Sequence, residues 1–105
     1  MELLTNEQKA RIPALYSQEN EADPLCGIKF FTPDAQWTWY AIEGGTIDDH
    51  PDDFMFFGYV SGLECELGYF TLAQLREVRG ALGLPVERDL YFQPAPLSTI
   101  KAKHE

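Results

Sequence analysis

Aromatic and β-branched residues gather in four short segments in the middle of the chain, each bounded by Gly, Pro, Asp or Ser. The segments cover residues 27–32, 36–42, 54–60 and 65–70. Such composition between turn residues is typical of β-strands. Because the connections are short, consecutive strands are expected to pair antiparallel rather than to cross over. The pattern therefore predicts a four-stranded antiparallel meander sheet.

Two helices are predicted from capping boxes, in which a Thr and a Gln three residues later each accept from the other's backbone amide. One helix starts after Thr5 and should end near Arg11, because Pro13 disfavours helical geometry at the residue before it. The second follows Thr71 and covers residues 72–80, where apolar residues recur at helical intervals. The fold class predicted is α+β, with a short N-terminal helix and a longer helix after the fourth strand.

The C-terminal part of the chain has neither a helical nor a strand pattern. Residues 86–97 contain Pro94 and Pro96, so we expect an extended, proline-containing arm that lies on the body of the domain. Residues 100–105 are expected to fray as a tail. The chain, residues 1–105, is expected to form a single domain, since half of it would be too small to bury a core of its own.

The predicted strands carry aromatic residues in consecutive pairs, such as Phe30 with Phe31 and Phe56 with Phe57. Successive side chains of a strand point to opposite faces, so both faces of the sheet are apolar. Either the helix after Thr71 covers one face while the first helix and the C-terminal arm cover much of the other, or one face is an exposed recognition or oligomer surface. Coverage of both faces is favoured, because large exposed apolar patches are uncommon on monomers.

The distribution of charged residues along the chain limits the classes of partner that it could bind. The chain has 105 residues, of which 45% are hydrophobic and 13% aromatic, and its formal net charge is −9. No Lys or Arg occurs between Lys29 and Arg76, whereas eight acidic residues do: Asp34, Glu43, Asp48, Asp49, Asp52, Asp53, Glu64 and Glu66. Such a stretch repels a phosphate backbone, so we expect no direct binding of nucleic acid and favour a basic protein partner.

The two cysteines and the N-terminus indicate the compartment. Cys26 and Cys65 lie in predicted strands without CxxC spacing or a neighbouring histidine, as expected of reduced thiols in a cytoplasmic protein. The first residues do not resemble a signal peptide, and no run approaches the ~18 apolar residues that a membrane span needs. We therefore expect a cytoplasmic location and no membrane association.

The candidate chemistry is weak, and no catalytic, cofactor or metal motif is recognised. His50 lies among four aspartates, but residues 48–53 lack both the glycine turn of a calcium loop and the second His or Cys of a transition-metal site. Glu64 and Glu66 could share one face of a strand. Paired carboxylates, however, divide acid and base roles only where burial makes their pKa values differ. A small hydrolase-like enzyme that uses Glu43, Glu64, Glu66 or His50 stays open as an alternative.

Three segments together resemble a bacterial family of unknown function: KFFTPDAQWTWYAIEG, FFGYVSGLECELGYFTLAQL and RGALGLPVERDLYFQPAPL. The resemblance extends from Leu4 to about Leu97. That family consists of small single-domain proteins carried on plasmids and integrative or conjugative elements, and it has no assigned catalytic residues. The resemblance thus implies an accessory protein of mobile DNA and transfers no site to this chain.

The leading functional hypothesis is an acidic protein-interaction module. It would act as an accessory or inhibitory protein of mobile DNA and bind the basic surface of a nucleic-acid-binding protein as a charge mimic, through the eight acidic residues named above. Besides the hydrolase, a second alternative is a binder of single-stranded nucleic acid, because bases stack on the aromatic residues of a sheet. The negative charge argues against this last hypothesis.

Overall fold

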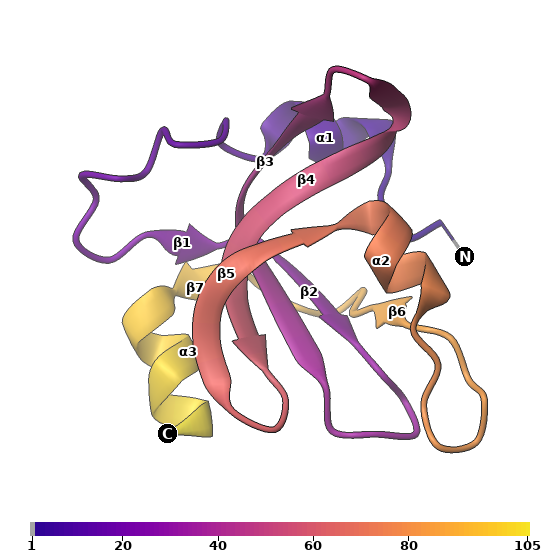
Figure 1. Ribbon diagram of the computed structural model, residues 1–105. Helices are drawn as coiled ribbons and strands as arrows, with labels where there is room; N and C mark the ends of the chain where they lie inside the picture. The colour runs from indigo at the N-terminus through magenta and orange to yellow at the C-terminus, as the bar shows by residue number, and fades with distance from the viewer. Residues whose placement is uncertain (1) are drawn as a thin grey trace.

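The computed structural model describes residues 2–105, and a five-stranded antiparallel sheet with the order β5-β4-β3-β2-β6 is its main element (Figure 1). The strands are β2 (Ile28–Phe31), β3 (Thr38–Ile47), β4 (His50–Ser61), β5 (Cys65–Thr71) and β6 (Glu87–Arg88). A small second sheet pairs β1 (Leu25–Cys26) with β7 (Ala95–Pro96). The helices within residues 2–105 are α1 (Asn6–Arg11), α2 (Leu72–Glu77) and α3 (Leu97–His104).

The prediction of a four-stranded meander is wrong. The main sheet has a fifth strand, β6, which pairs antiparallel with β2, and the chain also forms the second sheet of β1 and β7. Residues 86–97 are therefore not simply an extended arm. Strands of two residues have no periodicity that a sequence pattern could reveal, and their neighbours in space define them. One such contact is the hydrogen bond of 2.9 Å that the N–H of Asp89 donates to the carbonyl of Lys29.

The β3–β4 hairpin is longer than the hydrophobic pattern indicated. The predicted strands end at residue 42 and begin again at residue 54, but both strands of the hairpin continue to a turn at Asp48 and Asp49. The hairpin extends beyond the core at the top of Figure 1, where polar side chains such as Asp52 stay exposed although they belong to a strand. Helix α2, by contrast, ends at Glu77 and is shorter than the predicted range of 72–80.

Both predicted capping boxes are present. At the start of α1, the Gln8 amide donates to Thr5 Oγ1 over 3.2 Å, and the Thr5 amide donates to Gln8 Oε1 over 3.1 Å. Thr71 and Gln74 make the same pair of bonds at the start of α2, over 3.1 and 2.9 Å. These reciprocal bonds satisfy amides that a helix start leaves without partners, which is why the two starts could be located from sequence.

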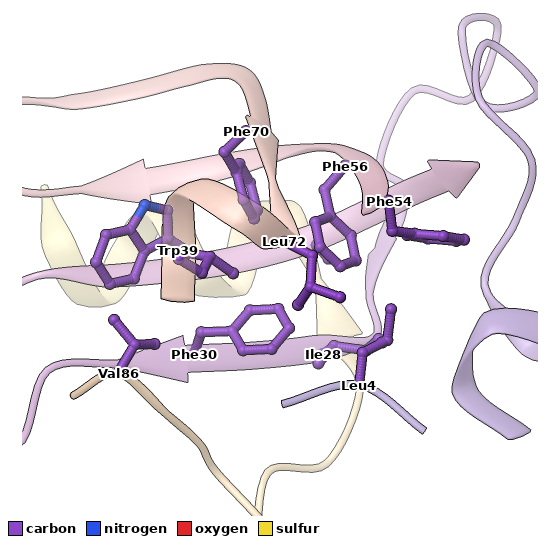
Figure 2. Packing of buried hydrophobic residues seen from close by; sticks show 11 residues of the cluster. Leu4, Ile28, Phe30, Trp39, Phe54, Phe56, Phe70, Leu72 and Val86 are labelled. Carbon is purple, nitrogen blue, oxygen red and sulfur yellow. The ribbon is translucent and has the colours of Figure 1, made fainter. Parts of the chain in front are cut away.

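One face of the main sheet is covered by α2 and by the N-terminal segment around Leu4, as Figure 2 shows. The fully buried Phe56 lies near its centre, with ring centroids 5.2 Å from Phe70 and 5.5 Å from Phe30. The buried residues of this cluster are Leu4, Ile28, Phe30, Trp39, Ala41, Phe54, Phe56, Phe70, Leu72, Leu75 and Val86. This is the larger of the two hydrophobic cores.

The opposite face of the sheet is covered by α3 and the small β1–β7 sheet. Its buried residues are Cys26, Tyr40, Ile42, Tyr59, Leu97 and Ile100. Helix α1, which was expected to help cover this face, buries none of its residues. The cover comes instead from β1, from the end of the predicted arm and from α3, whose last residues were expected to fray.

Helix α3 lacks a capping residue of its own, which is why its sequence did not predict it. Pro96 occupies the N-cap and makes no side-chain hydrogen bond. The carboxylate of Asp23, 75 residues away in the chain, accepts from the amide of Ser98 over 2.8 Å and from its hydroxyl over 2.6 Å. The amide of Leu97 donates to the carbonyl of Pro24 over 2.8 Å. The cap is thus a tertiary contact that appears only after the chain folds.

The C-terminal end of α3 is fixed to the sheet by two tyrosines. The Tyr40 hydroxyl lies 2.8 Å from His104 Nε2, and the Tyr59 hydroxyl donates to Glu105 Oε2 over 2.5 Å. Burial, followed by the hydrogen bond to Glu105, raises the pKa of Tyr59, so its hydroxyl stays protonated and remains a donor. Both ends of the helix are therefore held by residues from elsewhere in the chain.

We predict that Ile100→Ala lowers the free energy of unfolding by about 2–5 kcal/mol, because Ile100 is fully buried and its removal leaves a cavity under α3. The exposed Lys103 of the same helix gives the control, and Lys103→Ala should change stability by no more than about 0.5 kcal/mol. Urea denaturation measures both. If both substitutions lowered the free energy of unfolding by the same small amount, α3 would not be packed on the sheet.

We also predict that the Asp23 cap weakens in acid. The side-chain and then the backbone hydrogen bond from Ser98 lower the pKa of Asp23. A carboxyl whose folded pKa is depressed stabilises the fold above its unfolded pKa of about 3.9, and this contribution is lost as pH falls through the folded value. In urea denaturation, wild type should therefore exceed Asp23→Asn in stability at pH 6, and the difference should shrink as pH falls below about 4. If the stability difference between wild type and Asp23→Asn did not change with pH, the ionised carboxylate of Asp23 would not be the cap of α3.

Candidate functional site

Helix α3 is too short to cover the second sheet face. With 8 residues it spans on the order of 12 Å, whereas the 12 residues of β4 span about 40 Å. A hollow of about 410 Å³ lies on the uncovered part, with Ile42, Glu43 and Phe57 from the two central strands and Leu67 and Tyr69 from β5 among its lining residues. We call this hollow the groove.

A β-bulge places Glu43 in the groove. The pairing of β3 with β4 shifts by one residue between Ala41 and Glu43, and Glu43 then pairs opposite Phe57. An extra residue in one strand breaks the alternation of faces locally. As a result, both Ile42 and Glu43 line the groove.

The Glu43 carboxylate holds the connection between α1 and β1 against the sheet. Glu43 is only 3% exposed; its Oε1 accepts from the amide of Tyr16 and its Oε2 from that of Gln18, both over 2.8 Å. The amide of Gly44 donates to the carbonyl of Pro13 over 2.9 Å. Hydrogen bonds to an ionised group are stronger than neutral ones, and they satisfy a carboxylate that would otherwise be costly to bury. Glu43 is therefore a positioning residue that shapes the groove.

Two exposed tyrosines lie against each other in the groove. Tyr16 adopts a left-handed backbone conformation with φ of 69°, and its ring centroid lies 6.4 Å from that of Tyr69. The two side chains are 60% and 53% exposed, so both have free surface for contact. Burial raises the pKa of Tyr69, and Tyr16 and the carboxylates of Glu43 and Glu19 add to the effect. The Tyr69 hydroxyl is therefore protonated at neutral pH and lies in a negative potential.

The rim of the groove is negative. Glu19 and Glu21 lie on it and are exposed, and Lys101 is the one basic side chain among its lining residues. Within residues 2–105 the ion pairs join Arg11 to Glu7 and Lys29 to Asp89, so neither rim glutamate is neutralised by a pair. An apolar floor, exposed tyrosines and free carboxylates together suit a ligand that combines apolar and basic groups.

The eight predicted binding residues do not form one surface. Four lie in the β3–β4 hairpin at the top of Figure 1: Asp48, Asp49, Asp52 and Asp53. Three lie near the turns at the other end of the sheet: Asp34, Glu64 and Glu66. Glu43 alone lies in the groove, while Asp48 borders a shallower hollow that shares Tyr16 and Tyr69 with it. The groove and the hairpin are thus neighbours, and the other three residues lie outside the groove.

Besides Glu43, two of the eight carboxylates have partners within the fold. Asp53 Oδ1 accepts from the amide of Ala73 over 2.9 Å and so connects β4 with the start of α2. Asp34 Oδ2 accepts from the amides of Leu82 and Leu84 over 2.6 and 3.2 Å. These bonds stabilise a helix start and a loop, so both residues have a structural role.

The residues of the hydrolase alternative do not converge on one site. His50 is at the hairpin tip, Glu64 and Glu66 are exposed around the β4–β5 turn, and both carboxylate oxygens of Glu43 already accept hydrogen bonds. Residues 2–105 hold no group of three or more His, Cys, Asp or Glu side chains that could bind a metal ion. The arrangement offers no pair of carboxylates that could share acid and base roles.

Cys26 and Cys65 are both free thiols, in β1 and β5 respectively. Cys26 is buried, and burial, with a smaller contribution from Asp23, raises the pKa of its thiol to about 12. It is therefore protonated at neutral pH and a poor nucleophile. Across residues 2–105, no helix has the length and apolar character to span a membrane.

Most residues of the groove were not predicted from the sequence. Tyr16, Tyr69 and Leu67 were not singled out from the sequence, and neither were Glu19 and Glu21. One signal was present in the sequence: the run Ile42-Glu43-Gly44-Gly45 breaks the alternation of the strand, as a bulge does. The partners of this bulge lie 25 and 27 residues away from Glu43 and could not be inferred from local pattern.

A family model described as "Protein of unknown function (DUF2958)" matches residues 3–103. No curated protein and no solved structure matches the chain. The matched range includes both sheets and all residues named as lining the groove.

We predict that Glu43→Gln weakens the attachment of the connection between α1 and β1. The amide group of Gln offers one acceptor oxygen in place of two, so one backbone amide loses its partner, at a cost of about 1–3 kcal/mol. Hydrogen exchange of the Tyr16 and Gln18 amides should accelerate. Glu66→Gln, at an exposed position, is the control and should leave both exchange rates unchanged. Unaltered exchange in Glu43→Gln would show that the carboxylate does not hold the connection.

Proposed function

This chain belongs to the DUF2958 family of proteins of unknown function, and we propose that it is a protein-interaction domain that binds a positively charged partner protein. The observation that carries the proposal is the groove, where exposed Tyr16 and Tyr69 stand beside the free carboxylates of Glu19 and Glu21. Tyrosine is enriched at protein interfaces because its ring buries apolar area while its hydroxyl still makes hydrogen bonds.

The partner that fits this surface best is a basic, nucleic-acid-binding protein. The net charge of −9 repels nucleic acid itself and steers basic proteins toward the acidic side. An accessory or inhibitory role in mobile DNA, in which the chain occupies a basic groove as a charge mimic, is part of the proposal. In that role the acting charges are the groove rim and the adjoining hairpin tip at Asp48, rather than all eight acidic residues.

The two alternatives have less support. A hydrolase would need carboxylates that converge, whereas Glu43 is occupied by amides and Glu64 and Glu66 are exposed. A single-strand binder needs exposed aromatic rings in the sheet, but Phe30 and Phe56 are fully buried. The aromatic rings that are exposed around the groove lie among carboxylates, and these carboxylates repel the phosphate groups of a nucleic acid.

Affinity capture with three immobilised forms of the protein tests the proposal. The baits are wild type, the groove variant Glu19→Lys with Glu21→Lys, and a control, Glu2→Lys with Glu77→Lys. Both variants change the net charge equally at exposed positions, and the control lies beside α2 on the opposite face of the sheet. We expect wild type and control to retain the same basic protein from the native host, and the groove variant to lose it.

The retained protein should be released as salt rises, because the screening length falls from about 10 Å at 0.1 M to about 3 Å at 1 M. With the purified partner, the groove variant should reduce the association rate measured by surface plasmon resonance, whereas the control should not. Retention of the same proteins by all three baits, or retention of acidic proteins only, would overturn the proposed function.

A further inference from the structure

Strand β5 forms an open edge of the main sheet beside the groove. It pairs with β4 alone, and within residues 2–105 no strand lies on its other side. Natural sheets protect such edges with lysine, proline, bulges or a covering element. The β5 sequence, CELGYFT, contains neither lysine nor proline, and its pairing with β4 runs in regular register. The edge is thus a seven-residue strand without these features, and Glu66 is its one charged residue.

The backbone groups of Leu67 and Tyr69 point outward from this edge. The amide of Thr71 donates to Gln74 Oε1 and therefore does not face β4. At the other end of β5, the amide of Gly62 donates to the carbonyl of Glu64 across the turn. Residues of an antiparallel strand direct their N–H and C=O groups alternately to one side and the other. Thr71 points away from β4 and Glu64 points toward it. By this alternation, the N–H and C=O groups of Leu67 and Tyr69 point away from β4.

The side chains of this edge are also exposed. Leu67 is 43% and Tyr69 53% exposed on the groove face. Gly68 lies between them on the other face, and a Cβ built there would meet no atom within 4 Å. The chain's own packing therefore gives no reason for glycine at this position. Glycine within a strand often marks a place where another backbone approaches closely.

The charge around β5 indicates which kind of strand can pair with this edge. Glu66 belongs to β5 and Glu64 to the adjoining turn, Glu19 and Glu21 lie on the groove rim, and β5 itself has no basic residue. A second copy of this chain, also with a net charge of −9, would bring the same glutamates together if the two β5 edges paired. Like charges brought together disfavour such a pair, whereas a basic segment is attracted.

We infer that β5 is the docking edge for an extended, Lys- or Arg-rich segment of the partner protein, which adds to the sheet as an antiparallel or parallel strand. The inference rests on the proposed function and specifies how the partner binds. The backbone groups of Leu67 and Tyr69 bond the incoming strand, and its apolar side chains lie against these two residues. Its alternate, long basic side chains lie on the other face of the sheet, where they reach Glu66.

A ten-residue acetylated peptide of alternating Arg and Val serves as the probe, and the ¹⁵N-labelled full chain is observed by NMR. The Leu67 and Tyr69 amides, which have no acceptor among residues 2–105, should exchange with solvent at least tenfold more slowly when the peptide is bound. A peptide of equal length and charge with Pro in place of Val should bind at least tenfold more weakly, because proline cannot extend a ladder. Replacing Arg by Glu should abolish binding.

A pair of matched variants locates the contact. Leu67→Lys with Tyr69→Lys places protective charges on the edge and should weaken peptide binding at least tenfold. Leu82→Lys with Tyr91→Lys removes similar exposed apolar surface and adds the same charge on loops away from β5, so its affinity should equal that of wild type. Circular dichroism confirms that each variant is folded before binding is measured.

Three results would overturn strand addition. One is binding that leaves the exchange of Leu67 and Tyr69 unchanged or that tolerates proline. Another is absence of binding at millimolar peptide. The third is protection of the two amides in the protein alone, rising with concentration together with a dimer in sedimentation, which would make a second copy the occupant. Because the capture experiment depends on Glu19 and Glu21 and uses no peptide, it would still decide the proposed function separately.

Discussion

Apolar side chains stand on both faces of β3 and β4, and most of the remaining chain is arranged to keep those faces from water. Trp39 and Phe56 are buried on one face, and Tyr40 and Tyr59 on the other. Burial of aromatic side chains of this size dominates the energetics of a small core. One face receives α2, which directly follows β5. The other receives α3, which comes from the end of the chain and has to be fixed by contacts distant in sequence.

The groove is a consequence of that second, incomplete cover. Helix α3 packs over Tyr40 and Tyr59, and the sheet extends beyond it to Phe57 and Tyr69. The connection between α1 and β1 lies beside the uncovered part because the Glu43 carboxylate bonds its amides. One buried charge therefore does two things: it satisfies a backbone that would otherwise lack partners, and it shapes a surface with exposed tyrosines on it.

The groove and the open β5 edge form one continuous surface, because Leu67 and Tyr69 belong to both. An edge with free backbone groups gives affinity without sequence preference, whereas neighbouring side chains and charges supply the preference. The carboxylates of Glu19, Glu21 and Glu66 also disfavour pairing between two copies of the chain. A single set of acidic residues can in this way attract one class of partner and protect the edge from self-association.

The sequence by itself determined the elements whose signals are local. Both capping boxes lie within four residues, and the strands around Phe30, Trp39, Phe56 and Phe70 were located by composition, although their lengths and the architecture of the whole sheet were not. It also determined the overall acidity. Tertiary structure alone decided the pairing of β6 with β2, the cap that Asp23 provides for α3, and the loop held by Glu43. These features depend on a few hydrogen bonds and two-residue pairings between distant segments, which leave no periodic trace in the chain. The groove that Glu43 shapes therefore existed only once the backbone had folded.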